Sequence, residues 1–559
     1  MANNKYPWEQ WYNDKQMKID YPQGSCYDSL LATSNDYPNY KAYNYYGKEV
    51  EYKELVNDVD NVAKSLKEIG VKEGDYITIC SSNVPEAIIA LYAVNKIGAI
   101  ANMVHPKTSI EELKFFLDLT KSKIVIGLDV VVYPFLKELE KTKIEKIVLF
   151  NVYTSISVSR TINQKIDIKS DKIEVIEWEK FYMLSKIAEN TESIGKKEDI
   201  CVVLYSGGTT GKPKGVMISN YNLNALAYEG WFANNSLEPG DSMLAVMPIF
   251  HGFGLGICIH TSFCFGLKAV IQPKLDVQNF DQLLIDYKPN MVAGVPSIYE
   301  YLLKSKKLDN ADLSFLKGVS SGGDSLTISM KNKINKFLKD RGSKVGVKEG
   351  YGLTDCVTGT CLMPKDIDKD GSVGIPYTDT IYKIVEPNTF NELKYGEVGE
   401  IVISAPTIMV GYLGNEEETN KALRKDKNGI TWFYTGDLGL IDEDGFVYYK
   451  GRIKRMIISS GYNIYPDQIE EIIEKNPKVL ASSVVGIPDE MKGEIPVAFV
   501  VLKGADNEDM IMNDIKKYVT ENVSKYAIPK EYFIIDNIPK TPVGKVDYKA
   551  LVTFFSTKK

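Results

Sequence analysis

A glycine-rich segment, YSGGTTGKPKG at residues 205–215, carries the strongest chemical signal in the sequence. Its small residues let the backbone approach an anion closely, while Thr209 and Thr210 add hydroxyl donors and Lys212 and Lys214 add positive charge. This set suits the phosphates of a nucleoside triphosphate. A Walker A loop is excluded, because serine stands at the first glycine position and proline follows the lysine where serine or threonine is required. Taken alone, the segment also fits a flexible glycine turn.

Two further segments place reactive side chains beside glycines. EGYGLTD offers an aromatic ring that can stack on a base (Tyr351), a hydroxyl that can donate to a phosphate oxygen (Thr354) and a carboxylate that can hold Mg²⁺ (Asp355). PIFHGFG places His251 in an apolar, glycine-rich bend. A histidine in such a bend acts at a site or packs in the core, and this segment alone leaves both interpretations open.

Three segments near the C-terminus add charged groups. TGDLG contains Asp437, whose two oxygens can accept both hydroxyl groups of a ribose. GRIKRMIISSGYNIYP contains Arg452 and Arg455, and IPKTPVGKVDYKAL holds Lys545 after a glycine in a predicted turn. As isolated features, the last two segments also fit a charged hairpin and a solvated lysine.

Composition limits the classes of protein that these residues can serve. The chain has 559 residues, 44% apolar and 25% charged, which excludes a disordered, collagenous or coiled-coil protein. A net charge of −7 without basic blocks argues against a nucleic-acid binder. The uncharged stretch 242–267 contains proline and several glycines, so we expect a buried strand, turn and helix rather than a membrane span. Seven cysteines without a C-x-x-C pair predict reduced thiols and a cytoplasmic protein.

The elements that must position these residues alternate in type. Strands predicted over 76–80 and 99–104 enclose a helix over 86–96, which favours a parallel sheet with helices on its faces. After about residue 370 the apolar runs become shorter and β-rich, and Asp444-Gly445 predicts a hairpin. From about residue 452 the pattern is that of a small α+β unit. The sequence therefore predicts an α/β protein with a large N-terminal body and a small C-terminal lid.

Together and in this order, these segments resemble the adenylate-forming superfamily of acyl-CoA synthetases, nonribosomal adenylation domains and beetle luciferases, from about residue 50 to 551. The resemblance implies that a carboxylic acid and ATP form an acyl-adenylate and pyrophosphate, after which the acyl group passes to a thiol. It also implies stacked α/β subdomains and a β-rich subdomain in an N-terminal domain over 1–451. A small mobile α+β domain is implied over 452–559, with a hinge near Lys454.

The resemblance assigns roles residue by residue. ATP and AMP contacts are implied for Ser206, Gly207, Gly208, Thr209, Thr210, Gly211, Lys212, Lys214, Gly323, Asp324, Tyr351, Gly352, Thr354, Asp437 and Arg452. An acyl pocket is implied for Phe250, His251, Phe253, Gly294, Val295, Gly322 and Gly350. Catalytic roles are implied for Lys545, Thr354 and His251, metal contacts for Asp355 and Thr209, and a coenzyme A channel for Ser460, Gly461 and Tyr462. Two residues depart from the family pattern: Asp355 stands where glutamate is usual, and Arg455 replaces an acidic residue beside the hinge.

We therefore expect an ATP-dependent acyl-CoA synthetase, an AMP-forming acid–thiol ligase that acts on a medium- or long-chain fatty acid. ATP, Mg²⁺ and coenzyme A are its expected cofactors and co-substrates, a homodimer is possible, and neither nucleic acid nor a transmembrane segment is expected. The main alternative is a stand-alone adenylating enzyme that loads an acyl- or peptidyl-carrier protein. A luciferase-like oxidative step and a non-catalytic nucleotide-binding protein are further alternatives. The acid and the oligomeric state stay open.

Overall fold

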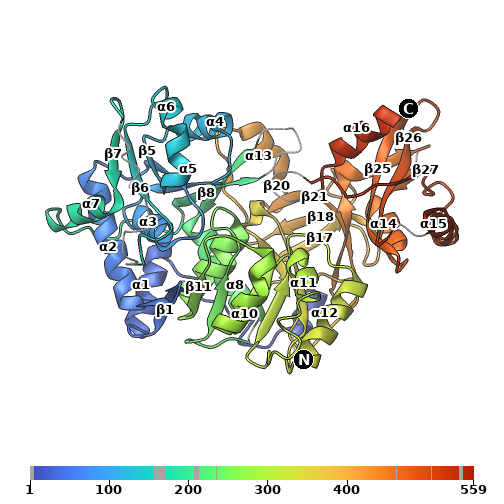
Figure 1. Ribbon diagram of the computed structural model, residues 1–559, viewed down its shortest axis with the longest axis horizontal. Coiled ribbons are helices and arrows are strands. Elements are labelled where there is room, and N and C mark those ends of the chain that lie inside the picture. Colours follow the sequence, from blue (N-terminus) through green and yellow to red (C-terminus); the bar gives the residue numbers. More distant parts are fainter. Residues whose placement is uncertain are drawn as a thin grey trace. The chain divides into compact units, whose positions relative to one another are not determined.

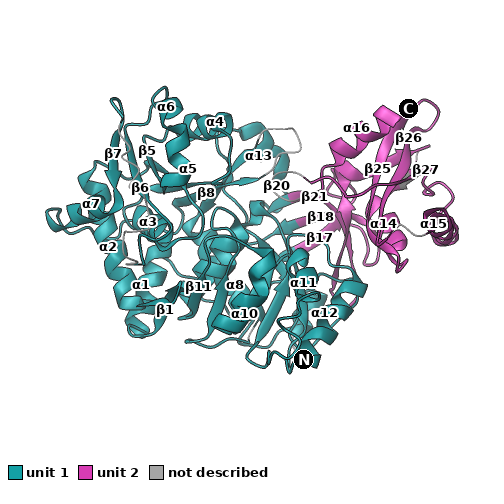
Figure 2. Cartoon of the chain, viewed as in Figure 1, with its two compact units in different colours: residues 1–381, 403–433 teal, residues 382–402, 434–559 magenta. Residues whose placement is uncertain are grey.

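The computed structural model describes residues 5–156, 170–206, 213–234, 236–460, 462–504, 507–540 and 546–558. Contacts group the chain into two compact units, drawn in different colours in Figure 2. The first unit comprises Met1–Ile381 and Ile403–Phe433, and the second comprises Tyr382–Val402 and Tyr434–Lys559. A mixed α/β fold with a large N-terminal body and a small C-terminal part is confirmed. We expected a domain boundary at residue 452 because the C-terminal domain is expected to move about a hinge there, and this boundary stays a prediction.

An eight-stranded sheet forms one layer of the first unit (Figure 1). In spatial order its strands are β19 (Gly411–Tyr412), β9 (Lys214–Ser219), β8 (Ile200–Ser206), β4 (Ile100–Val104), β3 (Tyr76–Cys80), β5 (Ile124–Leu128), β6 (Lys146–Phe150) and β7 (Glu174–Glu177). The strands from β8 to β7 are parallel, as predicted, whereas β9 runs antiparallel to β8 and β19 antiparallel to β9. Because such strands are covered on both faces, β4 and β5 are buried throughout, and Asn102 is the one polar side chain in the two strands.

A nine-stranded sheet forms the rest of the first unit. Its strands in order are β16 (Ile375–Pro376), β15 (Gly359–Leu362), β14 (Val347–Gly352), β13 (Gly318–Ser321), β12 (Met291–Gly294), β10 (Ser242–Ala245), β11 (Lys268–Ile271), β1 (Lys41–Tyr45) and β2 (Lys48–Glu51). The run from β14 to β1 is parallel, so the carboxyl ends of β12, β13 and β14 lie at one edge. That edge is where open α/β sheets place their ligands.

Helices connect and cover both sheets (Figure 1). They are α1 (Cys26–Asp36), α2 (Tyr52–Glu68), α3 (Pro85–Lys96), α4 (Ile110–Thr120), α5 (Asp129–Val132), α6 (Leu136–Leu139), α7 (Trp178–Met183), α8 (Asn220–Asn234), α9 (Thr261–Cys264), α10 (Phe280–Tyr287), α11 (Pro296–Leu302), α12 (Ile328–Asp340) and α13 (Glu416–Ala422). Ser219 precedes α8, and its hydroxyl accepts the Asn222 amide at 3.2 Å, as expected of a helix cap.

The uncharged stretch folds as predicted, into β10, the π-helical segment η4 (Phe253–His260) and α9. In the part of the chain that the structure describes, no helix has the length and apolar character needed to cross a bilayer. All seven cysteines are among the described residues, and each is a free thiol.

The second unit is built around two smaller sheets. One contains β17 (Ile381–Val385), β18 (Gly399–Ser404), β21 (Thr431–Ile441), β20 (Leu423–Lys425) and β22 (Val447–Arg452), although β20 and the start of β21 belong to the first unit. The other contains β24 (Tyr462–Ile464), β23 (Ile457–Ser459), β26 (Gly493–Leu502), β25 (Val479–Asp489) and β27 (Glu531–Ile534), with helices α14 (Pro466–Glu474), α15 (Glu508–Asn522) and α16 (Tyr548–Lys558). The predicted hairpin at Asp444-Gly445 joins β21 to β22, and the predicted α+β unit is present.

Candidate active site

One cavity of the first unit, about 260 Å³ in volume, brings two of the sequence motifs, PIFHGFG and EGYGLTD, together with the predicted residues Gly322 and Gly323. Eight of the predicted site residues line it: His251, Phe253, Gly322, Gly323, Gly350, Tyr351, Gly352 and Thr354. These residues follow β10, β13 and β14 or lie at their carboxyl ends, so the parallel register places them at one edge of the sheet. The histidine is exposed at this cavity, so the packed-core interpretation does not apply to it.

The cavity continues inward because one face of β13 carries only small residues. Gly318 and Ser320 point to the same face, Gly322 follows two positions later, and all three line the cavity. On the neighbouring strand, Gly350 extends this hollow surface. The deep part is lined by larger residues that sequence reasoning missed: Trp231, Asn234, Met243, Ile257 and Met291. We did not predict a strand at 318–321, and small residues at every second position of that segment are the signal that could have indicated this channel.

A strained turn fixes two of the motifs against each other. Val357 has φ 63° and ψ −61°, a conformation that β-branched residues rarely adopt. The turn comes directly after η6 (Thr354–Cys356). A Cβ on Gly252 would lie 1.6 Å from the Val357 carbonyl oxygen, and one on Gly352 would lie 1.5 Å from the Thr358 carbonyl oxygen. Glycine is therefore required in both motifs, because only glycine lets these backbones touch.

Asp355 is a buried carboxylate held by the β19 region. Its side chain accepts a hydrogen bond from the Tyr412 hydroxyl, and its carbonyl oxygen accepts the Met409 amide at 2.8 Å. Mg²⁺ is usually bound by one or two carboxylates together with substrate phosphates, so a single aspartate beside Thr354 fits that ion. Among the described residues, no three acidic, histidine or cysteine side chains gather as a complete metal site.

Lys214, at the start of β9, is engaged within the protein. Its ammonium group lies 2.5 Å from a Glu418 carboxylate oxygen and 4.5 Å from the centre of the Tyr412 ring. Hydrogen bonds from Lys214 and Lys421 lower the pKa of Glu418 to about 2. A phosphate contact by Lys214 therefore requires the lysine to exchange Glu418 for the nucleotide, and the assignment stays a prediction.

Seven described residues that were predicted for the site in the first unit do not line the cavity: Ser206, Lys214 and Asp355, and also Phe250, Gly294, Val295 and Asp324. A Cβ on Gly294 would point at α11, 2.6 Å from Ile298 Cδ1, because this glycine lies on the face opposite the cavity. Asp324 is exposed and accepts the amide of the next residue at 2.9 Å. Phe250 packs against His105 with ring centres 4.4 Å apart, and Val295 lies beside Gly323.

The second unit holds the remaining charged residues. Antiparallel pairing places Arg452 opposite Asp437, and the Arg452 Nε lies 2.9 Å from an oxygen of the buried Asp437 carboxylate. Arg455 forms ion pairs with Asp467 and, at 2.7 Å, with Glu470. Arg455, which departs from the family pattern, thus attaches the segment after β22 to helix α14.

The predicted hinge and coenzyme A residues lie close to that segment in sequence. Lys454 is the middle residue of η7 (Ile453–Arg455). Ser460 has φ 51° in the turn between β23 and β24, and the exposed Tyr462 ring stacks on Tyr526 with centres 4.3 Å apart. Ser206 ends β8 opposite Lys214. The other predicted residues lie outside the described part of the chain: Gly207, Gly208, Thr209, Thr210, Gly211, Lys212, Gly461 and Lys545.

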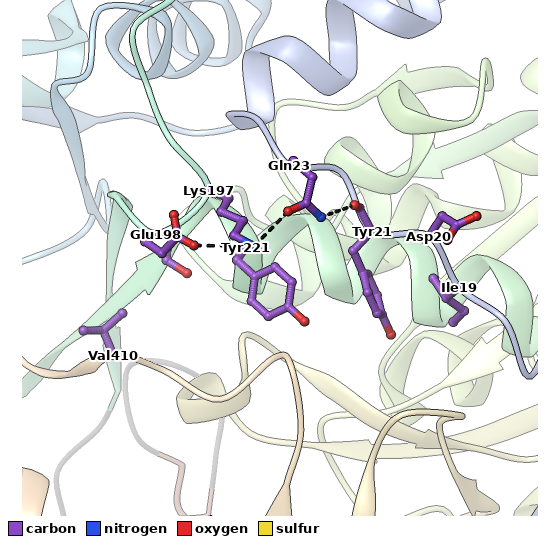
Figure 3. Close-up of a pocket in the computed structure, with 9 residues that line it drawn as sticks. Ile19, Asp20, Tyr21, Gln23, Lys197, Glu198, Tyr221 and Val410 are labelled. Carbon is purple, nitrogen blue, oxygen red and sulfur yellow. Dashed lines mark hydrogen bonds and ion pairs between the residues drawn. The ribbon is translucent and has the colours of Figure 1, made fainter.

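A second, open hollow of about 730 Å³ lies elsewhere in the first unit (Figure 3). Its polar side chains bind one another: the Lys197 ammonium donates to Gln23 at 2.8 Å and lies 3.5 Å from Glu198, while Gln23 donates to the Tyr21 carbonyl oxygen at 2.8 Å (Figure 3). None of the predicted site residues lines this hollow, so the first cavity is the candidate active site.

The fold and the first cavity define an α/β protein with a ligand site at the carboxyl ends of parallel strands. The sequence profile of the AMP-binding enzymes matches residues 30–413, and that of the AMP-binding enzyme C-terminal domain matches residues 468–545. The chain therefore belongs to the family of AMP-binding enzymes, and the resemblance inferred from the motifs is confirmed.

Individual relatives agree with this assignment. A long-chain-fatty-acid–CoA ligase of Bacillus subtilis (strain 168) is 30% identical over 554 residues, covering 97% of this chain and 96% of the relative. A luciferin 4-monooxygenase of Photuris pensylvanica is 30% identical, with 92% and 91% of the two chains covered. The crystal structure of ATP-bound MatB from Rhodopseudomonas palustris has the same fold, with a TM-score of 0.81, 24% identity and coverage of 96% and 99%.

Within this family the chain is an AMP-forming acid–thiol ligase of the acyl-CoA ligase group. Enzymes of this group use ATP, Mg²⁺ and coenzyme A, so the expected cofactors are confirmed.

Proposed function

We propose that this protein is an ATP-dependent acyl-CoA synthetase. A carboxylic acid and ATP give an acyl-adenylate and pyrophosphate, and the acyl group then passes to the thiol of coenzyme A with release of AMP. The observation that carries the proposal is the single cavity that joins His251, Tyr351 and Thr354 at the strand ends and continues along β13 as a largely apolar channel. A nucleotide at the strand ends and an acyl chain in the channel would meet beside His251.

Within this proposal, the predicted site residues have defined tasks. Tyr351 stacks on the adenine, Thr354 donates to the α-phosphate, and Asp437 and Arg452 bind the ribose. Asp355 holds Mg²⁺, and that ion, when bound, offsets the repulsion between a carboxylate and a phosphate. Lys545 bridges the same two anions. The 2.9 Å contact between Arg452 and Asp437 supports a joint role for these two residues.

For the acid, we propose a fatty acid of medium or long chain. The apolar side chains of Trp231, Ile257, Met243 and Met291 support this substrate, and the Bacillus subtilis relative carries the name of a long-chain-fatty-acid ligase. We place the reaction in the cytoplasm, which the seven free thiols support.

The proposal is tested by measuring pyrophosphate release with ATP, Mg²⁺ and a panel of aliphatic, aryl and sterol acids, each with and without coenzyme A. Products are identified by mass. We expect an acyl-CoA peak that depends on coenzyme A, with the highest kcat/KM for aliphatic acids. Asp437→Ala is the matched variant, and we expect it to raise the KM for ATP because the ribose loses a bidentate acceptor.

Two outcomes would contradict the proposal. Acyl-AMP that accumulates and ignores coenzyme A would identify a carrier protein as the acceptor. An absence of pyrophosphate with every acid would exclude the adenylation step itself.

A further inference from the structure

Lys348 lies in the wall of the acyl channel. On strand β14, the neighbouring Glu349 faces α12, where its carboxylate lies 3.2 Å from the Lys331 ammonium. Successive residues of a strand point to opposite faces, so Lys348 and Gly350 point to the other face, and both line the cavity. Ser320 of β13 is opposite Lys348 in the parallel register and lines the same surface.

The ammonium group of Lys348 has a neutral hydrogen-bond partner, and the charges of Asp368 and Asp366 act on it from farther away. It donates to the Ile367 carbonyl oxygen at 2.6 Å, and no carboxylate of the described residues lies within 4.0 Å of it. Other buried or lining lysines differ in this respect: Lys331 pairs with Glu349 and Asp368, and Lys317 lies 2.8 Å from Asp241. Lys348 is half-buried, and burial lowers the pKa of its ammonium group.

A cation in this position does not match a purely hydrocarbon ligand. Burying an ammonium group beside a methyl-terminated chain is unfavourable, because the chain removes water and supplies no anion. A ligand that carries its own carboxylate into the channel would instead form a charge-assisted hydrogen bond. The exposed rim nearby carries charges of both signs, Lys344, Lys365 and Asp366. Among the described lysines of the wall, Lys317 and Lys348 are half-buried, and only Lys317 is in contact with a carboxylate.

We propose that the acid substrate carries a second carboxylate at its far end, and that Lys348 is the residue that selects it. This inference rests on the proposed function and deepens it, since it names an α,ω-dicarboxylic aliphatic acid as the substrate class. One carboxylate reacts at the strand ends, and the other binds the Lys348 ammonium beside the Ser320 hydroxyl.

The position of Lys348 sets the length of that acid. Lys348 precedes Gly350 by two residues and Tyr351 by three, a separation of about 7–10 Å at roughly 3.3 Å per residue. An extended alkyl chain advances by roughly 1.3 Å per carbon, so the matching diacid has about six to nine carbons.

The test compares acids matched in length that differ only at the far end. Hexanoic acid is compared with hexanedioic acid, and octanoic acid with octanedioic acid, by coenzyme-A-dependent product formation measured by mass. We expect the wild-type kcat/KM to be about tenfold or more higher for each diacid, the size of one charge-assisted hydrogen bond. The substitution Lys348→Met should remove this preference by raising the KM for the diacids, and should leave the kcat/KM for the monoacids unchanged or higher.

Two further variants keep the test falsifiable. Lys344→Met removes an exposed rim lysine and should leave the diacid-to-monoacid ratio within about twofold, because rim charges are largely screened. Lys348→Arg retains the charge and should retain the preference, which a merely structural role of Lys348 would not predict. Folding of each variant is checked by its melting temperature, and if Lys348→Met does not fold, the wild-type ratio and Lys348→Arg decide.

Failure of this inference can be distinguished from failure of the proposed function. A wild-type enzyme that makes acyl-CoA but prefers the monoacid at both lengths overturns the inference and leaves the proposed function standing. A Lys348→Met variant that changes the kcat/KM for the monoacid and for the diacid by the same factor also overturns the inference. Absence of pyrophosphate with every mono- and dicarboxylic acid overturns the proposed function itself.

Discussion

Glu229 of helix α8 is a fully buried carboxyl group next to Gly230 of the channel wall. One of its oxygens accepts the Thr380 hydroxyl at 3.2 Å. Burial, reinforced by the charge of Asp379, raises the pKa of Glu229 to about 8. The group is therefore mostly protonated at neutral pH and acts as a neutral hydrogen-bonding residue.

The raised pKa of Glu229 predicts a pH-dependent stability. Because the folded-state pKa of about 8 exceeds the ordinary carboxyl value of 4.5, its contribution is fully present below about pH 4.5 and is lost as the pH rises through 8. Glu229→Gln keeps a neutral hydrogen-bonding group, so we expect the wild-type free energy of unfolding to fall relative to this variant between pH 5 and 9. The expected difference is on the order of a few kcal/mol.

Urea unfolding of the two proteins at pH 5, 7 and 9 measures this difference. Glu111→Gln, at an exposed position of α4, is the control and should parallel the wild type. Other buried acids are present in all three proteins and cancel in the comparison. Parallel pH profiles for the wild type and Glu229→Gln would show that the carboxyl group is not held protonated.

At the scale of a single element, strand β13 determines how deep the channel is. Its alternating small residues leave a hollow that α8 and η4 cover. Gly318 lies at the distal end, where an added Cβ would lie 2.4 Å from Met291 Sδ and 3.4 Å from Ser236 Oγ. Both neighbours line the channel, so a larger residue at 318 has to push into it.

Gly318→Val should therefore shorten the acids that the enzyme accepts. We expect the kcat/KM for the longest good substrate to fall about tenfold or more, while that for a four-carbon acid stays within about threefold, because only the distal end is filled. A series of acids from four to sixteen carbons, assayed by product mass, gives the profile. Gly504→Val, with no heavy atom within 4 Å of the added Cβ, is the control. An unchanged chain-length optimum would remove Gly318 from the distal end.

Local patterns in the sequence predicted several elements of the fold. Alternating strands and helices, the Asp444-Gly445 hairpin and the Ser219 cap all depend on nearby residues, and the structure confirms them. The channel could not be predicted in the same way, because it requires the register of Ser320 against Lys348 and the placement of α8 over both strands.

The distinction between features set by nearby residues and features set by tertiary packing also applies within the site. The motifs identified Tyr351 and Thr354, whereas the pairing of Lys214 with Glu418 joins residues about two hundred positions apart. The Val357 turn depends on a backbone contact with Gly252, which no local pattern contains. Interactions of this kind are set by tertiary packing, so sequence patterns alone do not reveal them.

At the scale of the whole molecule, the proposed reaction divides its residues between the two units. Tyr351 and Thr354 belong to the first unit, whereas Asp437, Arg452 and Lys545 belong to the second. Two successive reactions with different nucleophiles, a carboxylate and then a thiol, need different groups beside the same phosphorus and carbonyl centres. We therefore expect the adenylation and thioester-forming steps to respond differently to changes in the second unit.

Lys454→Pro and Lys545→Ala form a reciprocal pair that tests this expectation. Proline fixes its own φ, so it restricts rotation at the proposed hinge, and the first turn of a helical segment such as η7 tolerates it. We expect Lys454→Pro to keep acyl-AMP formation within about threefold of wild type and to lower thioester formation from supplied acyl-AMP by about tenfold or more. Lys545→Ala should do the reverse, because it removes the cation between carboxylate and α-phosphate while leaving thiol transfer intact.

Pyrophosphate release and acyl-CoA mass report the two steps separately. Each variant is the control for the other, since a general loss of folding would lower both steps in parallel. Parallel losses in two well-folded variants would contradict a division of labour between two arrangements of the molecule, and both steps would then take place with Lys545 in one position.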